Sequence, residues 1–583
     1  MRRFCTTENF ERVAHALVVV YLLVSGGRLG AQETSGFSNK PDYRWPPRVI
    51  YCTDGNWVYN YLTRRDPQDL NLILNALEGT HVDAVSVLVG IDDDLSWRGS
   101  PHGELFGDAT GNWNPDGNQN QQVDSQLTLR AIERLHRNMV AVIDDGHDLM
   151  QIYISRGHAI GLGMYGCFRM NDAHASDEKR SWSLRSHMKK TRPDLLLGSP
   201  SPTEVARADQ WNFCWQWDYA HLEVRERFLG LFDETLTRYD FDGLELDFCR
   251  GPDFFKPGQR FKNIPAMTEF MRRACGIVRR HEVARGKPLK LVARVPCSID
   301  HSLEAGLDIA RWIEEGLADV IVMASPYYAN LTVDVDRAVK HAKQSEVLVY
   351  TGFDSSTYTV SPQGGYERNP ETVLRAVALN GYKRGATGVH VFNFDYENHR
   401  PGPVPAGESL TAVSADPRTG RFTEKNFQTL RDLADPLALR SLDRCYYVDT
   451  GKTQVDHPVQ LPRKLALNGR GAASGHTLYL DIEDDLAAGL ASGRIKNTEL
   501  RLRLTDHEQS MDRVLCEVND YSVNLHTART IANSKGQQWL VLDNPPVREG
   551  RNRILLVLDG IRTPDPWPSL RQCEVIVKCQ PEG

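Results

Sequence analysis

Between Arg48 and Phe394 the sequence alternates short runs rich in Val, Ile and Leu with longer amphipathic stretches, and this alternation constrains the fold most. The short runs indicate buried parallel strands, and the amphipathic stretches indicate the helices that join them. Eight such units over about 350 residues predict an α/β fold, a (β/α)8 TIM barrel. An open doubly wound sheet is the rival, but no GxGxxG motif follows the first strand.

The predicted barrel strands are Val49–Thr53, Ala84–Gly90, Ile160–Phe168, Phe241–Phe248, Leu289–Val295, Val320–Ser325, Val347–Gly352 and Val389–Phe394. The predicted helices are Asp66–Leu77, Asp144–Arg156, Leu222–Tyr239, Pro265–Arg285, Leu303–Glu315, Val335–Gln344 and Pro370–Arg384.

The chain is predicted to contain two domains. The barrel is expected to span residues 45–435, with a Pro- and Gly-rich passage at 399–420 before a last helix near Glu424–Leu433. From about Leu442 the pattern changes to short alternating strands without long helices, which predicts a small all-β sandwich over residues 442–583. Its predicted strands are Leu478–Asp481, Glu499–Leu504, Arg513–Val518, Trp539–Leu542, Arg553–Leu558 and Cys573–Val577.

The N-terminal residues are typical of a secretory signal peptide. Arg2 and Arg3 precede an apolar run at 16–24 that is too short to cross about 30 Å of hydrocarbon. Small residues follow as far as Ala31, so we expect residues 1–31 to be removed and the protein to be exported, to the periplasm or outside the cell. An N-terminal anchor or a buried helix is the alternative.

Composition narrows the functional classes. The 583 residues carry 69 Lys+Arg and 76 Asp+Glu, a formal net charge of −7, which argues against nucleic acid as a partner. A mean hydropathy of −0.44 excludes a multispan membrane protein. Of 11 cysteines, Cys5 lies in the signal peptide, and among the others Cys573 and Cys579 are the first disulfide pair to consider. No motif predicts a metal or a cofactor, and the oligomeric state stays open.

The segment at 239–250 (YDFDGLELDFCR) carries the strongest functional signal. Side chains of a strand alternate between its two faces, so Glu245 and Asp247 share one face, and the apolar residues between them share the other. The apolar face of a barrel strand must meet the helices, so both carboxylates are expected to point into the lumen. Unpaired carboxylates are costly to bury, which favours catalysis or substrate contact. The alternative is a structural ion pair, for which inward-facing Arg294 is the candidate.

This segment resembles the D-G-x-D-x-D-x-E strand of the family 18 chitinases. Asp242, Gly243, Glu245 and Asp247 fall on the first four specified positions, and Cys249 stands where the chitinases have their acid glutamate. The layout of residues 45–435, including Phe168–Asp172 after the third strand, is similar to the bacterial family 10 glycosylhydrolase-like barrels. These resemblances imply a barrel glycoside hydrolase, and Cys249 separates it from the chitinase mechanism.

We expect a secreted glycoside hydrolase that cleaves a polysaccharide or oligosaccharide by carboxylate acid/base catalysis. Asp247 would be acid/base or nucleophile, and Glu245 would support it. Asp354 is the favoured second carboxyl. The alternatives at other strand ends are Asp395, Glu397, Asp300, Glu304 and Asp54. A non-catalytic carbohydrate-binding protein on a degenerate barrel is the alternative, and a metal-dependent hydrolase is disfavoured because the first strand has no HxH pair. Residues expected to bind substrate, anionic groups included, are Arg169, Asn171, Arg250, Arg294, Trp215, Tyr327 and Asp395.

Overall fold

The computed structural model describes residues 42–53, 70–106, 108, 136–172, 185–198, 215–325, 329–354, 356–357, 367–368, 371–394, 424–448, 461, 463–467, 477–532, 537–560, 562 and 564–580. The predicted signal peptide and the passage at 399–420 lie outside these residues. Within them, no helix is both long enough and apolar enough to cross a membrane.

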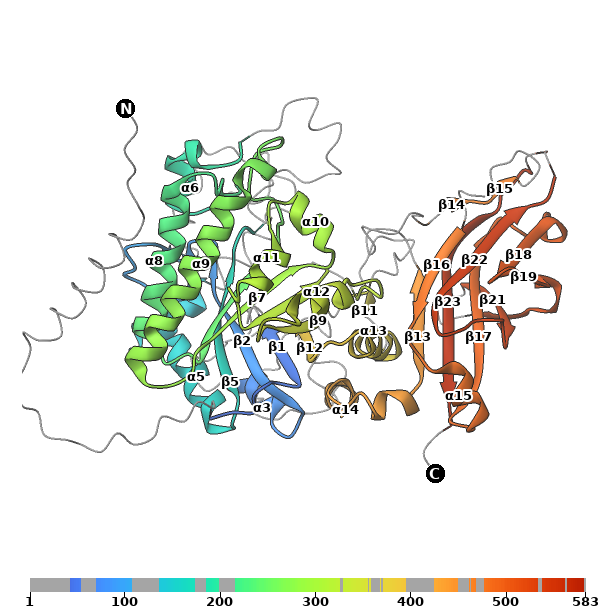
Figure 1. The fold of residues 1–583 in the computed structure, drawn as a ribbon, viewed down its shortest axis with the longest axis horizontal. Coiled ribbons are helices and arrows are strands. Elements are labelled where there is room, and N and C mark those ends of the chain that lie inside the picture. The colour runs from blue at the N-terminus through green and yellow to red at the C-terminus, as the bar shows by residue number, and fades with distance from the viewer. Residues whose placement is uncertain are drawn as a thin grey trace, which may run out of the picture. The chain divides into compact units, whose positions relative to one another are not determined.

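Eight parallel strands close into the predicted barrel (Figure 1). Each strand pairs with the next along the chain, and β1 closes the ring by pairing with both β2 and β12. The barrel strands are β1 (Val49–Thr53), β2 (Val82–Ile91), β5 (Gly163–Arg169), β6 (Gly243–Asp247), β7 (Lys290–Pro296), β8 (Val320–Ala324), β9 (Leu348–Asp354) and β12 (Gly388–Phe392). Short strands β3 (Asp94–Leu95) and β4 (Glu104–Leu105) extend β2, and β10 (Ser356–Thr357) pairs with β11 (Glu367–Arg368).

Helices connect the strands close to where the amphipathic pattern predicts them. One predicted helix, Leu303–Glu315, is two short helices, because Gly306 adopts a left-handed conformation (φ 90°) that ends the first of them. The helices are α3 (Leu72–Leu77), α5 (Leu149–Ala159), α6 (His187–Thr191), α8 (Leu222–Arg238), α9 (Arg260–Arg285), α10 (Ile299–Glu304), α11 (Ile309–Glu314), α12 (Val335–Ala342), α13 (Glu371–Lys383) and α14 (Glu424–Leu433).

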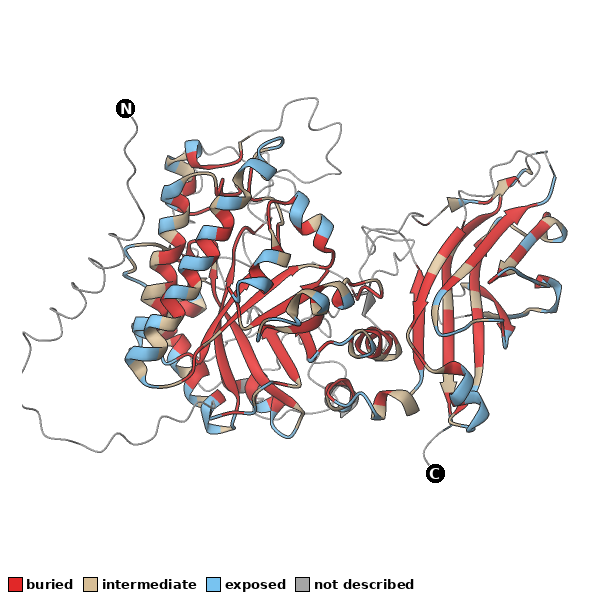
Figure 2. Ribbon diagram, in the orientation of Figure 1, coloured by how far each residue is buried: buried red, intermediate tan, exposed pale blue. Residues whose placement is uncertain are grey.

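The barrel strands are buried on both faces (Figure 2). Their outward side chains pack against the helices in one large apolar core. Near the N-terminal ends of the strands the lumen is also apolar, with Ile50, Tyr165 and Val320 in one buried cluster. Further along the strands the inward side chains become polar, so the charged part of the lumen lies toward the C-terminal ends of the strands.

The C-terminal domain is the predicted β-sandwich of two mainly antiparallel sheets (Figure 1). One sheet contains β13 (Arg444–Val448), β14 (Arg463–Lys464), β17 (Ile495–Thr505), β20 (Arg529–Ala532), β21 (Gln538–Asp543) and β23 (Ser569–Cys579). The other contains β15 (Ala466–Leu467), β16 (Thr477–Ile482), β18 (Val514–Val518), β19 (Tyr521–Val523) and β22 (Gly550–Leu558), and a short helix, α15 (Leu486–Ala491), precedes β17. Cys573 and Cys579 are both free thiols.

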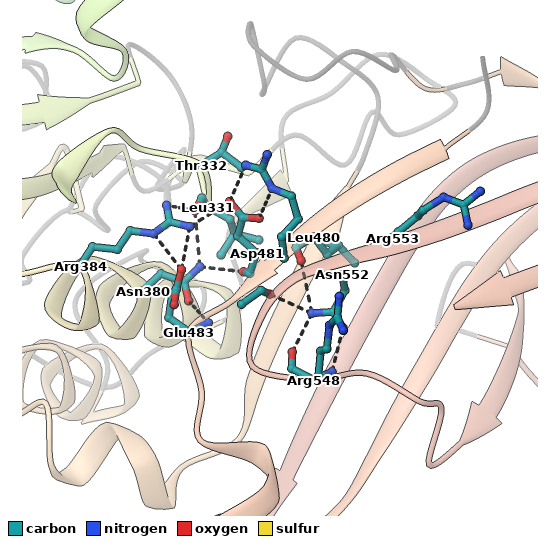
Figure 3. Close-up of polar contacts among 12 residues, drawn as sticks. Leu331, Thr332, Asn380, Arg384, Leu480, Asp481, Glu483, Arg548, Asn552 and Arg553 are labelled. Carbon is teal, nitrogen blue, oxygen red and sulfur yellow. Dashed lines mark hydrogen bonds and ion pairs between the residues drawn. The ribbon is translucent and has the colours of Figure 1, made fainter. Parts of the chain in front are cut away.

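Helix α13 of the barrel bonds directly to strand β16 and the residue that follows it (Figure 3). The buried amide of Asn380 donates to the Asp481 carbonyl over 2.8 Å and accepts from the Glu483 N–H over 3.0 Å. One helical turn on, the Arg384 guanidinium contacts the carboxylates of both Asp481 and Glu483. Polar side chains therefore fix this contact, and each needs its partner because it is shielded from water.

The N-terminal end of β6, the strand that carries Glu245 and Asp247, is held by Asp242. Its carboxylate accepts hydrogen bonds from His158 Nε2 over 2.9 Å and from the Met164 N–H over 2.8 Å. Next to it, Gly243 lies so close to β7 that a Cβ atom there would stand 1.9 Å from the Lys290 carbonyl oxygen. Both contacts set the register of β6 against its neighbours.

Gly243→Ala is expected to destabilise the protein by about 3 kcal/mol or more, because β6 and β7 must separate to admit the methyl group. The matched control is Gly276→Ala in α9, where a Cβ meets nothing within 4 Å, and it should be neutral or stabilising by up to about 1 kcal/mol. Urea unfolding of both variants measures the difference. Equal effects of the two substitutions would contradict the close approach at Gly243.

The His158–Asp242 pair is expected to make stability depend on pH. The hydrogen bond to Asp242 raises the pKa of His158, so this contribution is present below about pH 6.5 and is lost as pH rises through the raised value. Burial alone would raise the pKa of Asp242, but hydrogen bonds from His158 and Met164 lower it. The contribution of Asp242 to stability is therefore lost only as the pH falls through this lowered value. His158→Gln should therefore lower the urea midpoint more at about pH 5.5 than at about pH 8.5. A loss that is equal at both pH values would contradict the pairing.

Asn380→Ala should destabilise the protein by about 2 kcal/mol or more, because it removes the partners of a buried carbonyl and a buried N–H. Lys383→Ala on the same helix is the control. Its ammonium lies 3.6 Å from the exposed carboxylate of Glu549, so its loss should cost less than about 1 kcal/mol. Chemical unfolding compares the two, and an Asn380→Ala loss no larger than that of the control would refute the role of the amide.

Candidate active site

Both carboxylates of β6 project into the lumen, as the strand alternation predicts. Glu245 accepts a hydrogen bond from the Ser86 hydroxyl of β2 over 2.5 Å and lies 3.0 Å from His390 Nε2 of β12, across the barrel. Asp247, two residues nearer the mouth, contacts Arg294 of β7. Glu245 and Asp247 are fully buried. The orientation on which the functional prediction depends is therefore present.

Asp247 and Arg294 form a fully buried ion pair. Arg294 Nη1 lies 2.9 and 3.0 Å from the two carboxylate oxygens, and the Cys249 N–H donates to the same carboxylate over 2.9 Å. The other Arg294 Nη donates to the Ser325 carbonyl over 3.2 Å. The structural ion pair that the sequence offered as the alternative is thus observed.

Glu245 is an anion, and its environment makes it a poor proton donor. Burial alone would raise its pKa, but the charge and hydrogen bond of His390 and the hydroxyl of Ser86 lower the pKa to about 2. A general acid needs the opposite shift. Glu245 therefore suits a supporting role, in which it orders the lumen below Asp247.

Three arginines surround the Phe392 ring at the mouth of the barrel, and we call them the arginine cluster. The guanidinium carbons of Arg169, Arg250 and Arg294 lie 5.7, 5.2 and 4.4 Å from the ring centroid. They come from the C-terminal ends of β5 and β7 and from just beyond β6, and all three were expected from the sequence to bind substrate. Together they bring positive charge and an aromatic face to a single point.

Each member of the arginine cluster faces a carboxylate. Arg169 Nη1 lies 3.0 Å from Asp172, and Arg250 Nη1 lies 3.8 Å from Asp354, the last residue of β9. With Asp247 opposite Arg294, three carboxylates and three guanidinium groups meet at the mouth. The predicted second carboxyl, Asp354, therefore belongs to the same cluster as Asp247.

The other predicted substrate contacts have different placements. The Asn171 amide donates to the backbone carbonyls of Trp217 and Asp253 over 3.0 and 2.6 Å, so it holds two loops together. Trp217 is fully buried, and half-buried Trp215 stacks with Arg185 at 3.7 Å. Tyr327 and Asp395 lie outside the described residues.

Sequence analysis missed a buried ion network behind Arg169. Asp92, which follows β2, accepts from the Asp172 N–H over 2.9 Å and pairs with the buried ammonium of Lys189. Burial raises the pKa of Asp92 to about 6, against the lowering effect of Lys189. The acidic run at 92–94 is the sequence signal, but its partner on α6 is nearly a hundred residues away.

Sequence analysis also missed the polar layer that contains Glu245. Ser86 and His390 bond to this carboxylate, while Cys52 and Cys167 approach it and each other. Strand alternation would have placed all four side chains inward, yet their mutual distances depend on the stagger of the strands.

Among the described residues, grooves of about 610 and 510 Å³ lie elsewhere, near Asp233 on α8 and near Tyr382 on α13.

The sequence matches no protein family model and no curated protein. Solved structures that it matches include an α-L-fucosidase isoenzyme from Paenibacillus thiaminolyticus, at 11% identity over 67% of this chain and 48% of that one, with a TM-score of 0.36. This chain thus spans about half the length of that enzyme.

Two further matches are the glycoside hydrolase domain of PgaB from Bordetella bronchiseptica and a class V chitinase from Pseudomonas fluorescens. The first is 11% identical over 60% of this chain and 94% of that one, with a TM-score of 0.35. The second is 10% identical over 67% of this chain and 100% of that one, with a TM-score of 0.34.

Proposed function

We propose that this protein is a glycoside hydrolase that cleaves O-glycosyl bonds of a polysaccharide or oligosaccharide at the mouth of its barrel. One observation carries the proposal: Asp247 and Asp354, on strands β6 and β9, are brought by Arg294 and Arg250 to the same aromatic ring, Phe392. Barrel enzymes place their chemistry at the C-terminal ends of the strands, which is where these groups lie.

The two carboxyl groups have distinct parts in this proposal. Asp247, held as an anion by Arg294, attacks the anomeric carbon or activates a water molecule. Asp354 lies at the longer ion-pair distance of 3.8 Å from Arg250, and it is the group that gives a proton to the leaving oxygen. A separation of about 5–5.5 Å between the carboxyls would give retention, and about 6.5–9.5 Å would give inversion.

The arginine cluster favours a substrate with carboxylate or sulfate groups. A guanidinium binds such an anion through two parallel hydrogen bonds. Trp215 and Tyr327 remain the proposed sites for stacking on sugar rings. Export, with removal of residues 1–31, remains part of this proposal because a polysaccharide is met outside the cytoplasm.

A second candidate function is carbohydrate binding without catalysis. Two features favour it: Cys249 stands where the family 18 chitinases have a glutamate, and the Asp247–Arg294 pair is fully buried in the described structure. In that case the arginine cluster would bind anionic saccharides and the buried pair would only stabilise the barrel.

Asp247→Asn distinguishes the two functions. The parent protein is first screened for hydrolysis of neutral, sulfated and uronic polysaccharides, and the variant is then assayed on the substrate found. The amide keeps the shape and loses the charge, so turnover should fall by about a thousandfold or more while saccharide binding is retained. Asp336→Asn, on the exposed side of α12, is the control and should keep full turnover.

Binding is measured by calorimetry on the same samples. A parent protein that binds a saccharide but turns over none of the panel would support the binding protein and overturn the hydrolase. Full turnover by a folded Asp247→Asn protein would remove Asp247 from the mechanism.

A further inference from the structure

The lumen holds a second group of reactive side chains. It lies one inward-facing position closer to the N-terminal ends of the strands than the arginine cluster. Cys52 on β1, Cys167 on β5 and Glu245 on β6 are all buried, and their sulfur and carboxylate ligand atoms lie within 4.8 Å of one another. The three residues are far apart in the sequence and are brought together by the pairing of β1 with β2, of β2 with β5 and of β5 with β6. Two thiols and a carboxylate at one point are a donor set that binds metal ions.

The separations of these atoms match the ligand sphere of a small cation. The two sulfurs lie 3.9 Å apart, and Cys167 Sγ lies 3.7 Å from Glu245 Oε1. A tetrahedral Zn²⁺, with bonds of about 2.3 Å to sulfur and about 2.0 Å to oxygen, holds such ligands about 3.8 and about 3.5 Å apart. These two separations are therefore within about 0.2 Å of zinc geometry, and the third, between Cys52 Sγ and Glu245, lies within 4.8 Å.

A disulfide explains the two sulfurs less well. Strands β1 and β5 are not neighbours, because both pair with β2 between them. Adjacent strands lie about 4.8 Å apart, so the backbones of β1 and β5 are separated by roughly 9 Å. A disulfide requires Cα atoms closer than about 7 Å, and the backbone would have to move to form it.

Hydrogen bonds orient the carboxylate as they do in metal sites. Glu245 Oε2 accepts from the Ser86 hydroxyl over 2.5 Å, which leaves Oε1 turned toward Cys167. His390 Nε2 lies 3.0 Å from Oε2 and 3.2 Å from Oε1 and steadies the group from the opposite wall. Such outer partners fix the orientation of a ligand and raise metal affinity.

We propose that Cys52, Cys167 and Glu245 bind one Zn²⁺ ion in the barrel lumen, with the fourth position open to water. On binding, the two thiols give up their protons to solvent, two Zn–S bonds and one Zn–O bond form, and nothing is oxidised or reduced. The complex carries one net negative charge. The ion ties β1, β5 and β6 together beneath Asp247, and this inference does not depend on the proposed hydrolase activity.

The test uses the full chain. Protein is unfolded in chelator and reductant, then refolded with Zn²⁺, with Mg²⁺ or with no metal, and bound metal is measured by mass spectrometry after gel filtration. One Zn²⁺ per chain and a higher melting temperature with Zn²⁺ alone are expected, because thiolates select zinc over hard cations. Cys52→Ser and Cys167→Ser should lower zinc content at least about tenfold. Cys516→Ser, which removes a buried thiol of β18 in the sandwich, should keep it.

Co²⁺ refolded into the unaltered chain gives a readout that does not rely on the variants folding. A thiolate-to-cobalt charge-transfer band in the near ultraviolet supports the site. Absence of that band, zinc content unchanged by both serine variants, or an unreduced protein whose mass is two hydrogens lower through a Cys52–Cys167 disulfide would each overturn the proposal.

Discussion

A carboxylate and a guanidinium that are both fully buried in the barrel lumen, Asp247 and Arg294, set the conditions for the rest of the site. Removing either charge from water is costly, so each must keep its partner and have its remaining hydrogen-bonding groups satisfied. The Cys249 N–H and the Ser325 carbonyl supply two such bonds, whereas Arg294 Nε has no hydrogen-bond partner in the described part of the chain. The pair therefore fixes β6 against β7 and determines which atoms reach the mouth.

The lumen changes in character along the barrel axis. Apolar side chains such as Ile50 and Val320 fill its N-terminal part, the layer around Glu245 is polar, and the arginine cluster closes the described part of the mouth. This order lets the apolar end stabilise the closed barrel by burial, while the charged side chains of the lumen lie toward the end where barrel enzymes work. An unpaired buried carboxylate would weaken the barrel, and Ser86 and His390 supply the hydrogen bonds that Glu245 needs.

The barrel strands and the direction of the β6 carboxylates could be predicted from the sequence, because both depend on local residue patterns. The eight strands follow from apolar runs, and the inward direction of Glu245 and Asp247 follows from the two-residue period of β6. The residues that bond to Glu245 could not be predicted from the sequence, because the stagger of the strands decides which inward-facing residues meet. The break at Gly306 and the short strands β19 and β20 were missed because a single glycine and a few half-exposed residues leave little periodic signal.

A crystal structure of the protein with a bound sulfated or uronic oligosaccharide tests most directly whether the mouth of the barrel binds and cleaves the substrate. We expect the saccharide to lie over Phe392, with an anionic group on the arginine cluster. The scissile oxygen should lie within hydrogen-bond reach of Asp247 or Asp354. A saccharide bound only on the β-sandwich or on the outer helices, with the Asp247–Arg294 pair untouched, would contradict this expectation.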